Sequence, residues 1–315
     1  MLCRRILMLA LLVSAFFLMA NEASASASAV MNSVLVPAQV KSKLEQQVKL
    51  WSDALSNQPQ FETWKKATPV IVPIGPGTHG WLVTFLLNRK PVGYMIVNAT
   101  ENGGFELGEY GAGDRPAFDP NTLYRSLIRQ GLITSFAEAV KKPLHLERLY
   151  LSPVLAVWRW TTAAGETYYL DAWNGEALPV NDKMWDEQVA ASSASAKRIS
   201  QTETLATVSQ VRANPCFDPY ERMPWLTRSP LSFDQVRLHL PEYLDHKTQI
   251  RYTAELFRKT VLFVYPAIGY HRWNSGLSEN ANYGSSASSV FLEMDDEGSR
   301  FIPMTTLNAL GHFYR

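Results

Sequence analysis

Alternating apolar and polar runs are clearest in one stretch of the first half of the chain. Two apolar runs, Trp81–Leu87 and Val92–Val97, are separated by a polar segment, and a Gly103-Gly104 turn leads into the alternating Phe105–Glu109. Short apolar or alternating runs bounded by turn-forming residues are typical of strands joined by hairpins. The stretch therefore predicts a three-stranded antiparallel meander.

Apolar residues at helical spacing occur before and after this meander. One such pattern covers Val36–Ser56, and a second covers Leu123–Val140 with a break near Gly131. Each gives one apolar stripe, which is typical of a helix laid across a sheet. Further strand patterns in this half are the proline-containing edge strand Thr68–Ile74 and then His145–Leu151, Val154–Thr161 and Glu166–Ala172.

The last third of the chain repeats the mixture of helix and strand patterns. Ser232 is placed to cap a helix that runs through Leu244, and a short helix is expected from Thr305. The strand patterns are Gln249–Ala254, Thr260–Tyr265, Ala267–Trp273, Val290–Met294 and Arg300–Met304, the last two joined by a tight turn at Asp295–Gly298.

The order of these patterns predicts an α+β protein of two modules, each an antiparallel sheet with helices packed on one face. The first module covers residues 30–180 and is compatible with two copies of a helix-plus-meander unit. The second, smaller module covers residues 215–315. Residues 181–214 are rich in Ala and Ser and then polar, so they predict an interdomain linker.

Residues 1–29 have the pattern of a secretory signal peptide. Arg4-Arg5 precede the apolar run Ile6–Ala20, and Ala-Ser-Ala cleavage frames follow. The run is short for a membrane span of about 20 residues, which favours export with cleavage over a retained N-terminal anchor. No later segment is apolar enough to cross a bilayer, so we expect a secreted or cell-envelope protein of a bacterium.

Charge and cysteine content narrow the function classes. The 30 basic and 29 acidic residues give a net charge of +1, which offers no general attraction for nucleic acid. Without the signal segment, Cys216 is the one cysteine left, so the mature chain cannot form an internal disulfide or a thiolate zinc site. We find no cofactor motif and no metal-ligand spacing, and expect neither a cofactor nor a metal.

A short segment combines an aromatic-rich strand with a polar turn. In Tyr168–Leu178, Asp171 can accept backbone amides, and Asn174-Gly175 can supply positive φ. The segment resembles the closing strand and turn of PepSY-type modules, small α+β units of secreted-peptidase propeptides and bacterial envelope proteins. The resemblance implies a PepSY-like or cystatin-like first module and says nothing about catalysis.

Cys216 and His271 are the residues that an enzymatic interpretation would use. A cysteine followed by a histidine in the second domain resembles the layout of secreted bacterial cysteine peptidases. Those enzymes place the cysteine at the start of a helix, where its pKa is lowered, whereas Cys216 precedes Phe-Asp-Pro, which predicts a turn. We therefore expect no catalytic site. The alternative is a secreted cysteine-dependent hydrolase with a propeptide-like N-terminal region, in which Cys216 is the nucleophile and His271 the base.

Trp158 and Trp160 lie two apart on one face of a predicted strand. They could form an aromatic platform for a bound peptide or sugar, or they could be core residues under a helix. Together these observations predict a non-catalytic protein that binds or restrains a protein or peptide partner, for example a peptidase, by strand addition. A structural component of the envelope is a third interpretation.

Overall fold

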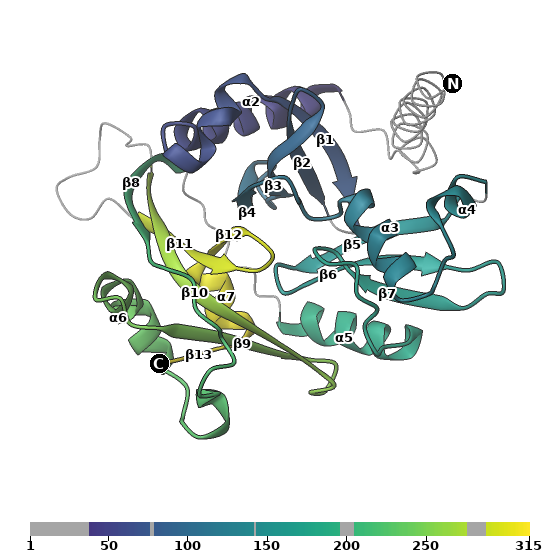
Figure 1. The fold of residues 1–315 in the computed structure, drawn as a ribbon. Coiled ribbons are helices and arrows are strands. Elements are labelled where there is room, and N and C mark those ends of the chain that lie inside the picture. The colour runs from purple at the N-terminus through teal and green to yellow at the C-terminus, as the bar shows by residue number, and fades with distance from the viewer. Residues whose placement is uncertain (1–37, 76–78, 142, 196–204, 276–287) are drawn as a thin grey trace, which may run out of the picture.

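The computed structural model describes residues 38–75, 79–141, 143–195, 205–275 and 288–315. Within them the chain forms one ten-stranded and one three-stranded antiparallel sheet, with helices packed against both (Figure 1). The α+β class expected from the sequence is confirmed. The expected signal peptide at residues 1–29 lies outside the described residues.

The first unit is a helix followed by a four-stranded meander. Its elements are α2 (Ala38–Leu55), the 3₁₀ helix η2 (Pro59–Lys66), β1 (Thr68–Ile74), β2 (Gly80–Leu87), β3 (Lys90–Ala99) and β4 (Phe105–Ala112). The expected meander is therefore present, and β1 forms the end of the sheet, as its two prolines predict.

The second unit has the same order of helix and meander but forms its own sheet. Its elements are α3 (Pro120–Arg129), α4 (Phe136–Lys141), β5 (His145–Ser152), β6 (Leu155–Thr161) and β7 (Thr167–Asp171). The helix break expected near Gly131 is confirmed, because Gly131 has a φ of 70° between α3 and α4.

The remaining elements mostly extend the large sheet. They are α5 (Asp182–Ser195), β8 (Leu205–Ala213), η3 (Pro224–Leu226), α6 (Phe233–Asp245), β9 (Ile250–Leu256), β10 (Val261–Ser275), β11 (Ser288–Asp295), β12 (Ser299–Pro303), α7 (Met304–Leu310) and β13 (His312–Tyr314). The expected cap of α6 is confirmed: Ser232 and Gln235 form a capping box.

The segment 181–214, expected to be a linker, contains a helix and a strand. In α5, Trp185 is buried and its ring stacks on that of Tyr169 at 4.9 Å. In β8, Leu205 is buried, whereas most of the following residues are exposed. Helix α5 is rich in Ala and Ser and is anchored by one buried tryptophan, and β8 is an exposed edge strand. Neither element needs many large apolar residues, so the composition of this segment is similar to that of a linker.

A single long strand replaces the two strands expected at 260–265 and 267–273. Pro266 lies between the two expected ranges and cannot donate a hydrogen bond. In β10, however, pairing with β11 begins only at Ala267, so the missing N–H of Pro266 removes no bond to β11. The strand can therefore continue through the proline.

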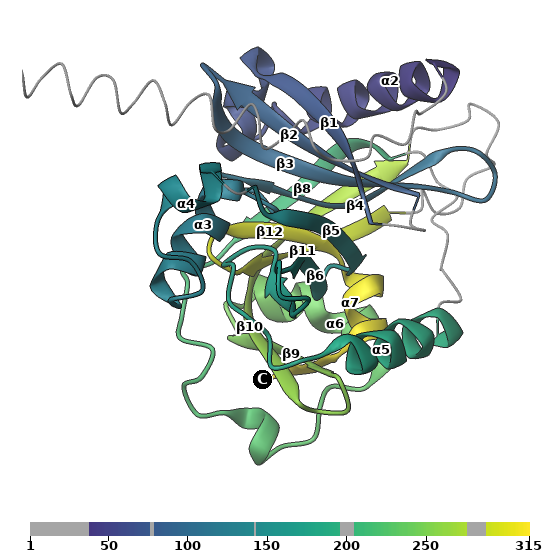
Figure 2. The ribbon, with the colours of Figure 1, turned by 90° about the vertical axis from the view of Figure 1, so that its right-hand side faces the viewer.

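The two expected modules share one sheet and one core. Strand β4 pairs with β12, with Tyr110 opposite Phe301 and Gly111 opposite Arg300. A Cβ at Gly111 would lie 2.6 Å from the Ser299 carbonyl oxygen, so only glycine allows this approach. One apolar cluster contains residues of α2, β2–β4, β8 and β10–β12, which lie on both sides of the expected boundary (Figure 2).

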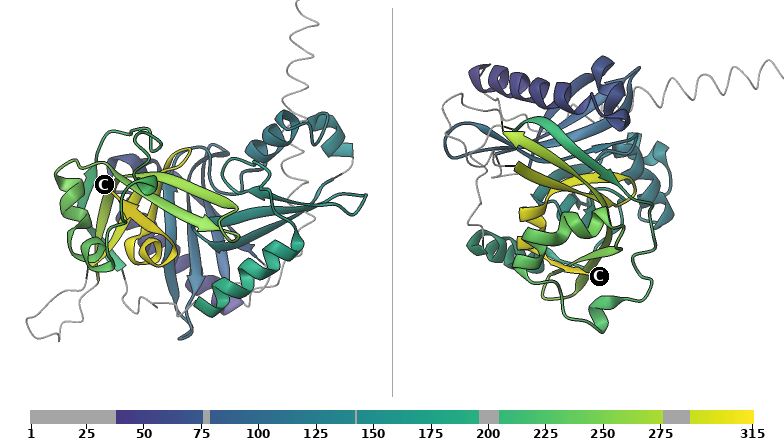
Figure 3. Two further views of the ribbon diagram at one scale, coloured as in Figure 1. Left: turned by 90° about the horizontal axis from the view of Figure 1, so that it is seen from below. Right: turned by 90° about the vertical axis from the view of Figure 1, so that its left-hand side faces the viewer.

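Helices cover both faces of each sheet, whereas one face was expected. In the large sheet, α2 lies on one face, and α6 and α7 pack on the other (Figure 2). In the small sheet, α3 and α4 cover one face, and α5 lies against the other (Figure 3). The expectation was wrong because α5 was not foreseen and because the two modules merge. Among the described helices, none has the length and apolar composition of a membrane span.

Candidate functional site

The structure places Cys216 and His271 in different environments. Cys216 is exposed in the loop that follows β8. The Asp295 carboxylate is the main cause that raises the pKa of its thiol. A catalytic thiol needs a lowered pKa, so this environment disfavours a nucleophile.

His271 is fully buried in β10. Its Nδ1 lies 2.9 Å from the Tyr110 hydroxyl, its Nε2 lies 3.4 Å from the Gln60 amide nitrogen, and its ring stacks on Phe301 at 4.0 Å. Burial lowers the pKa of His271 to about 3, so the ring is neutral. Both ring nitrogens face these partners, and among the described contacts none joins either nitrogen to Cys216.

Trp158 and Trp160 are core residues of the small sheet. Trp158 is 1% exposed and Trp160 is 7% exposed, and both belong to the cluster beneath α3. The Arg148 guanidinium lies 5.0 Å from the Trp158 ring centre, and Trp160 stacks on Tyr168. In this arrangement neither ring presents an open platform.

A buried polar group, here called the Arg300 cluster, lies where β4 and β12 join. Arg300 donates to Glu109 at 3.1 Å, to Asp296 at 2.5 Å and to the Pro153 carbonyl at 2.6 Å. The Tyr94 and Tyr150 hydroxyls also donate to Glu109. The guanidinium lies 3.5 Å from a ring centre of Trp173, and its Nε has no hydrogen-bond partner among the residues that the structure describes. The cluster ties the two sheets together at their junction.

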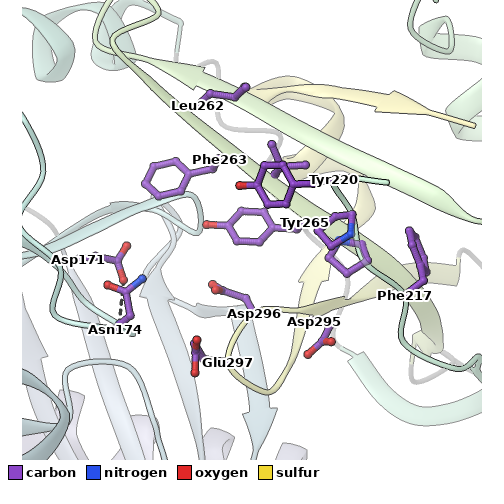
Figure 4. A pocket seen from close by; sticks show the side chains of 13 residues that line it. Asp171, Asn174, Phe217, Tyr220, Leu262, Phe263, Tyr265, Asp295, Asp296 and Glu297 are labelled. Atoms are coloured by element: carbon purple, nitrogen blue, oxygen red, sulfur yellow. Dashed lines mark hydrogen bonds between the residues drawn. The ribbon is translucent and has the colours of Figure 1, made fainter. Parts of the chain in front are cut away.

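A pocket of about 360 Å³ opens beside this cluster, here called the β10-edge pocket (Figure 4). Three parts of the fold contribute: the turn after β7, the β11–β12 turn and β10, with the loop after β8 at one side. Its lining residues are Asp171, Asn174, Phe217, Pro219, Tyr220, Leu262, Phe263, Val264, Tyr265, Pro266, Asp295, Asp296 and Glu297. The volume lies at the lower end of the range of about 300–1000 Å³ typical of ligand sites.

The pocket contains an open strand edge. Residues Val261–Pro266 of β10 pair with β9 on one side, but pairing with β11 begins only at Ala267. Five consecutive residues of this segment line the pocket, and consecutive side chains of a strand point to opposite faces. The backbone edge between the two faces is therefore directed toward the pocket.

The pocket lining includes four acidic residues and no basic residue. Asp296 is paired with Arg300, and Glu297 with Arg115 at 2.8 Å. Asp171 and Asp295 form no ion pair within the described part of the chain. Asp171 is 5% exposed, and one of its oxygens accepts the amides of Trp173 and Asn174. Burial, and then the charge of Asp296, raise the pKa of Asp171 to about 7.

The hydroxyl of Tyr265 also faces the pocket. Its side chain lies in β10 and is 9% exposed. In Figure 4 the hydroxyl points into the space between Asp171 and Asp296. No described residue forms a hydrogen bond with it. The ring is nearly buried, whereas the hydroxyl is reached from the pocket and can donate or accept a hydrogen bond with a ligand there.

From the sequence, two of the acidic parts of this lining are connected with turns. Asp171 was expected to accept turn amides, which the structure confirms, and Asp295–Gly298 was expected to form a hairpin turn, which is also present. Their convergence depends on the approach of the small sheet to β10, which no local pattern encodes. Within the described residues no group of three or more His, Cys, Asp or Glu is placed to hold a metal ion.

Comparisons with known proteins identify no relative. No family model matches the chain, and no curated protein and no solved structure matches it either. The PepSY-type resemblance around Asp171 stays a prediction.

Proposed function

We propose that this protein is an exported, non-catalytic binding protein that holds an extended peptide segment of a protein partner, for example a peptidase. The observation that carries the proposal is the open edge of β10 within the pocket. A peptide placed there would add one strand to the large sheet through backbone hydrogen bonds.

The edge of β10 differs from the edge of the large sheet at β1. At one end of the sheet β1 contains Pro69 and Pro73, a common way to prevent strand pairing. The open segment of β10 begins Val-Leu-Phe-Val-Tyr and contains no proline before Pro266 and no charged residue. An unprotected edge of about six residues, about 20 Å long, supports peptide capture.

The environments of Cys216 and His271 support a non-catalytic role. The thiol lies beside a carboxylate, which raises its pKa, and the imidazole is buried against Tyr110 and Gln60. The signal-peptide pattern of residues 1–29 supports export, and the PepSY-type resemblance fits a module that restrains a partner. The cysteine-dependent hydrolase is the alternative that the experiment must exclude.

The test is selection from a random decapeptide library, followed by fluorescence anisotropy with single labelled peptides. Selected peptides should bind in the micromolar range. N-methylation of alternate peptide amides should weaken binding by about tenfold or more in one register only, because it removes ladder hydrogen bonds. Amides of Val261–Tyr265 that do not bond to β9 should become protected from hydrogen exchange. Absence of binding up to about 1 mM, or no effect of N-methylation, would overturn the proposal.

A matched pair of variants locates the edge. Leu262 on β10 is 41% exposed, and Val211 on the edge strand β8 is 44% exposed. Leu262→Lys should weaken peptide binding by about tenfold or more, because a lysine on an edge opposes strand addition, whereas Val211→Lys should not. The reverse result would assign binding to β8. Iodoacetamide-sensitive turnover of labelled casein, lost in Cys216→Ala, would replace the proposal with the hydrolase alternative.

A further inference from the structure

Around the β10-edge pocket, buried carboxyl groups outnumber buried cationic groups. Glu109, Asp171 and Asp296 are close enough to Arg300 to influence or contact it, so three carboxyl groups share one buried guanidinium. Glu109 and Asp296 each accept hydrogen bonds from Arg300, whereas the donors to Asp171 within the described ranges are backbone amides. A buried carboxylate without a cation is costly, and a cation in the pocket would remove that cost.

Tyr265 gives an independent indication of a ligand. Its hydroxyl is directed into the same space as the carboxyl groups of Asp171 and Asp296 (Figure 4) and has no hydrogen-bond partner among the described residues. The hydroxyl can accept a hydrogen bond from an N–H donor. An organic cation supplies such donors in addition to its charge.

The walls of the pocket also fit an organic cation. The rings of Phe263 and Tyr265 lie nearly parallel, with centroids 6.0 Å apart, on one face of β10. Aromatic rings attract ammonium and guanidinium groups and cover the apolar stem of a long side chain. A metal ion would need at least three converging ligands, and no such group occurs in the described residues.

We propose that the β10-edge pocket recognises a guanidinium or primary ammonium group, supplied by an Arg or Lys side chain of the bound peptide, through Asp171, Asp296 and the Tyr265 hydroxyl. This inference rests on the proposed function only in naming a bound peptide as the source of the cation. The chemistry of the subsite does not depend on the peptide. Free amines and guanidines share that chemistry, so they form a separate arm of the test.

The peptide arm compares selected peptides that contain Lys or Arg with the same peptides carrying norleucine or citrulline. Removal of the charge should weaken binding by about tenfold or more in the wild-type protein. In Asp171→Asn the affinities for the charged and the uncharged peptide should differ by less than about twofold. The control Asp186→Asn, at an exposed position on α5, should keep the affinity difference of the wild-type protein. Asn can still accept the amides of Trp173 and Asn174, so the turn should keep its shape.

Tyr265→Phe provides a second variant that leaves every recorded hydrogen bond intact. The substitution should weaken binding of the charged peptide by about three- to tenfold and leave the affinity for the norleucine peptide unchanged. The preference for the charged peptide should also grow between about pH 5.5 and 8, as Asp171 ionises with a pKa of about 7. The other titratable or charged groups that face Asp171 are Asp296, Arg300 and Tyr265.

The outcomes separate this inference from the proposed function. Peptides that bind with N-methylation sensitivity but without preference for Lys or Arg overturn the cation subsite alone. Agmatine or butylamine that binds in an Asp171-dependent manner, without any peptide binding, supports the subsite and overturns peptide capture. Asp171-dependent binding of Ca²⁺ or Mg²⁺ in place of organic cations would overturn the inference.

Discussion

The Arg300 cluster and the β10-edge pocket lie side by side, and both bury carboxyl groups. In the Arg300 cluster, Glu109 accepts hydrogen bonds from Arg300, Tyr94 and Tyr150 and is fully enclosed. In the pocket, Asp171 is nearly as buried but, within the described part of the chain, forms no ion pair, and the Tyr265 hydroxyl has no hydrogen-bond partner there. A buried polar cluster whose carboxylates are paired with a cation and hydrogen-bond donors can join two layers of a fold. A buried carboxyl group that lacks such a cation and lies beside a cavity is suited to bind a ligand.

Loss of the guanidinium charge in the Arg300 cluster should have the largest effect on the free energy of unfolding. Arg300→Met leaves Glu109 and Asp296 without their guanidinium, which should lower the free energy of unfolding by about 3–5 kcal/mol. Arg115→Met removes only the exposed ion pair with Glu297 and should cost at most about 1 kcal/mol. Urea unfolding of both variants measures the difference. Equal effects would show that the Arg300 cluster contributes no more than a surface pair.

His271, which is buried against Tyr110, Gln60 and Phe301, predicts that the protein loses stability at acidic pH. Burial lowers the folded-state pKa of His271 to about 3, below the ordinary value of about 6.5 in the unfolded chain. The unfolded state therefore binds the extra proton, so stability is complete above about pH 6.5 and falls as the pH decreases toward 3. Between about pH 7 and 5 the loss should be about 2 kcal/mol.

The matching variant is His271→Gln, which cannot titrate. Its urea unfolding free energy should fall less steeply over the same pH interval, whatever its stability at neutral pH. Parallel pH curves for the wild-type protein and the variant would contradict a buried, neutral His271.

In the open pocket, removal of a charge should stabilise the protein. The folded-state pKa of Asp171 is raised to about 7, so this group favours the folded state most at low pH, and that contribution is lost as the pH rises from about 4 to 7. Asp171→Asn avoids this cost and should raise the unfolding free energy by about 1–3 kcal/mol near pH 8. The gain should shrink toward about pH 5. A variant less stable than the wild type near pH 8 would show that Asp171 is compensated after all.

The smallest effect is expected at Cys216. Its side chain is exposed and lies outside the Arg300 cluster and the contacts of His271, so Cys216→Ala should change the unfolding free energy by less than about 0.5 kcal/mol and leave peptide affinity unchanged. Alkylation of the thiol should be slow at neutral pH and faster in Asp295→Asn, because Asp295 is the main cause of its raised pKa. Rapid alkylation near pH 7 would contradict this environment.

Local patterns were enough to predict most helices and strands. The meander β2–β4, the break at Gly131 and the Ser232 cap each depend on residues close in sequence, and each is confirmed. Strand β8 and helix α5 were not foreseen, because exposed residues and small side chains carry little hydrophobic periodicity.

The candidate site depends on long-range packing that no spacing in the sequence reveals. The role of Asp171 as an acceptor of turn amides and the Asp295–Gly298 turn were predicted correctly, but the approach of these residues to one another needs the β4–β12 pairing and the docking of the small sheet. The open edge of β10 was also hidden, since it depends on where β11 stops pairing. Pro266 lies at the point where this open edge meets the pairing with β11, and a proline by itself does not show which edge of a strand is open.

The most direct test of the account is the titration of the Asp171 carboxyl carbon by ¹³C NMR, with and without a saturating Lys-containing peptide. In the free protein the carboxyl should titrate with a pKa of about 7. With the peptide bound, the ammonium group should lower that pKa by about 1–3 pH units. A carboxyl that already titrates near 4 in the free protein, or one whose titration the peptide leaves unchanged, would contradict an uncompensated carboxylate that receives a cation.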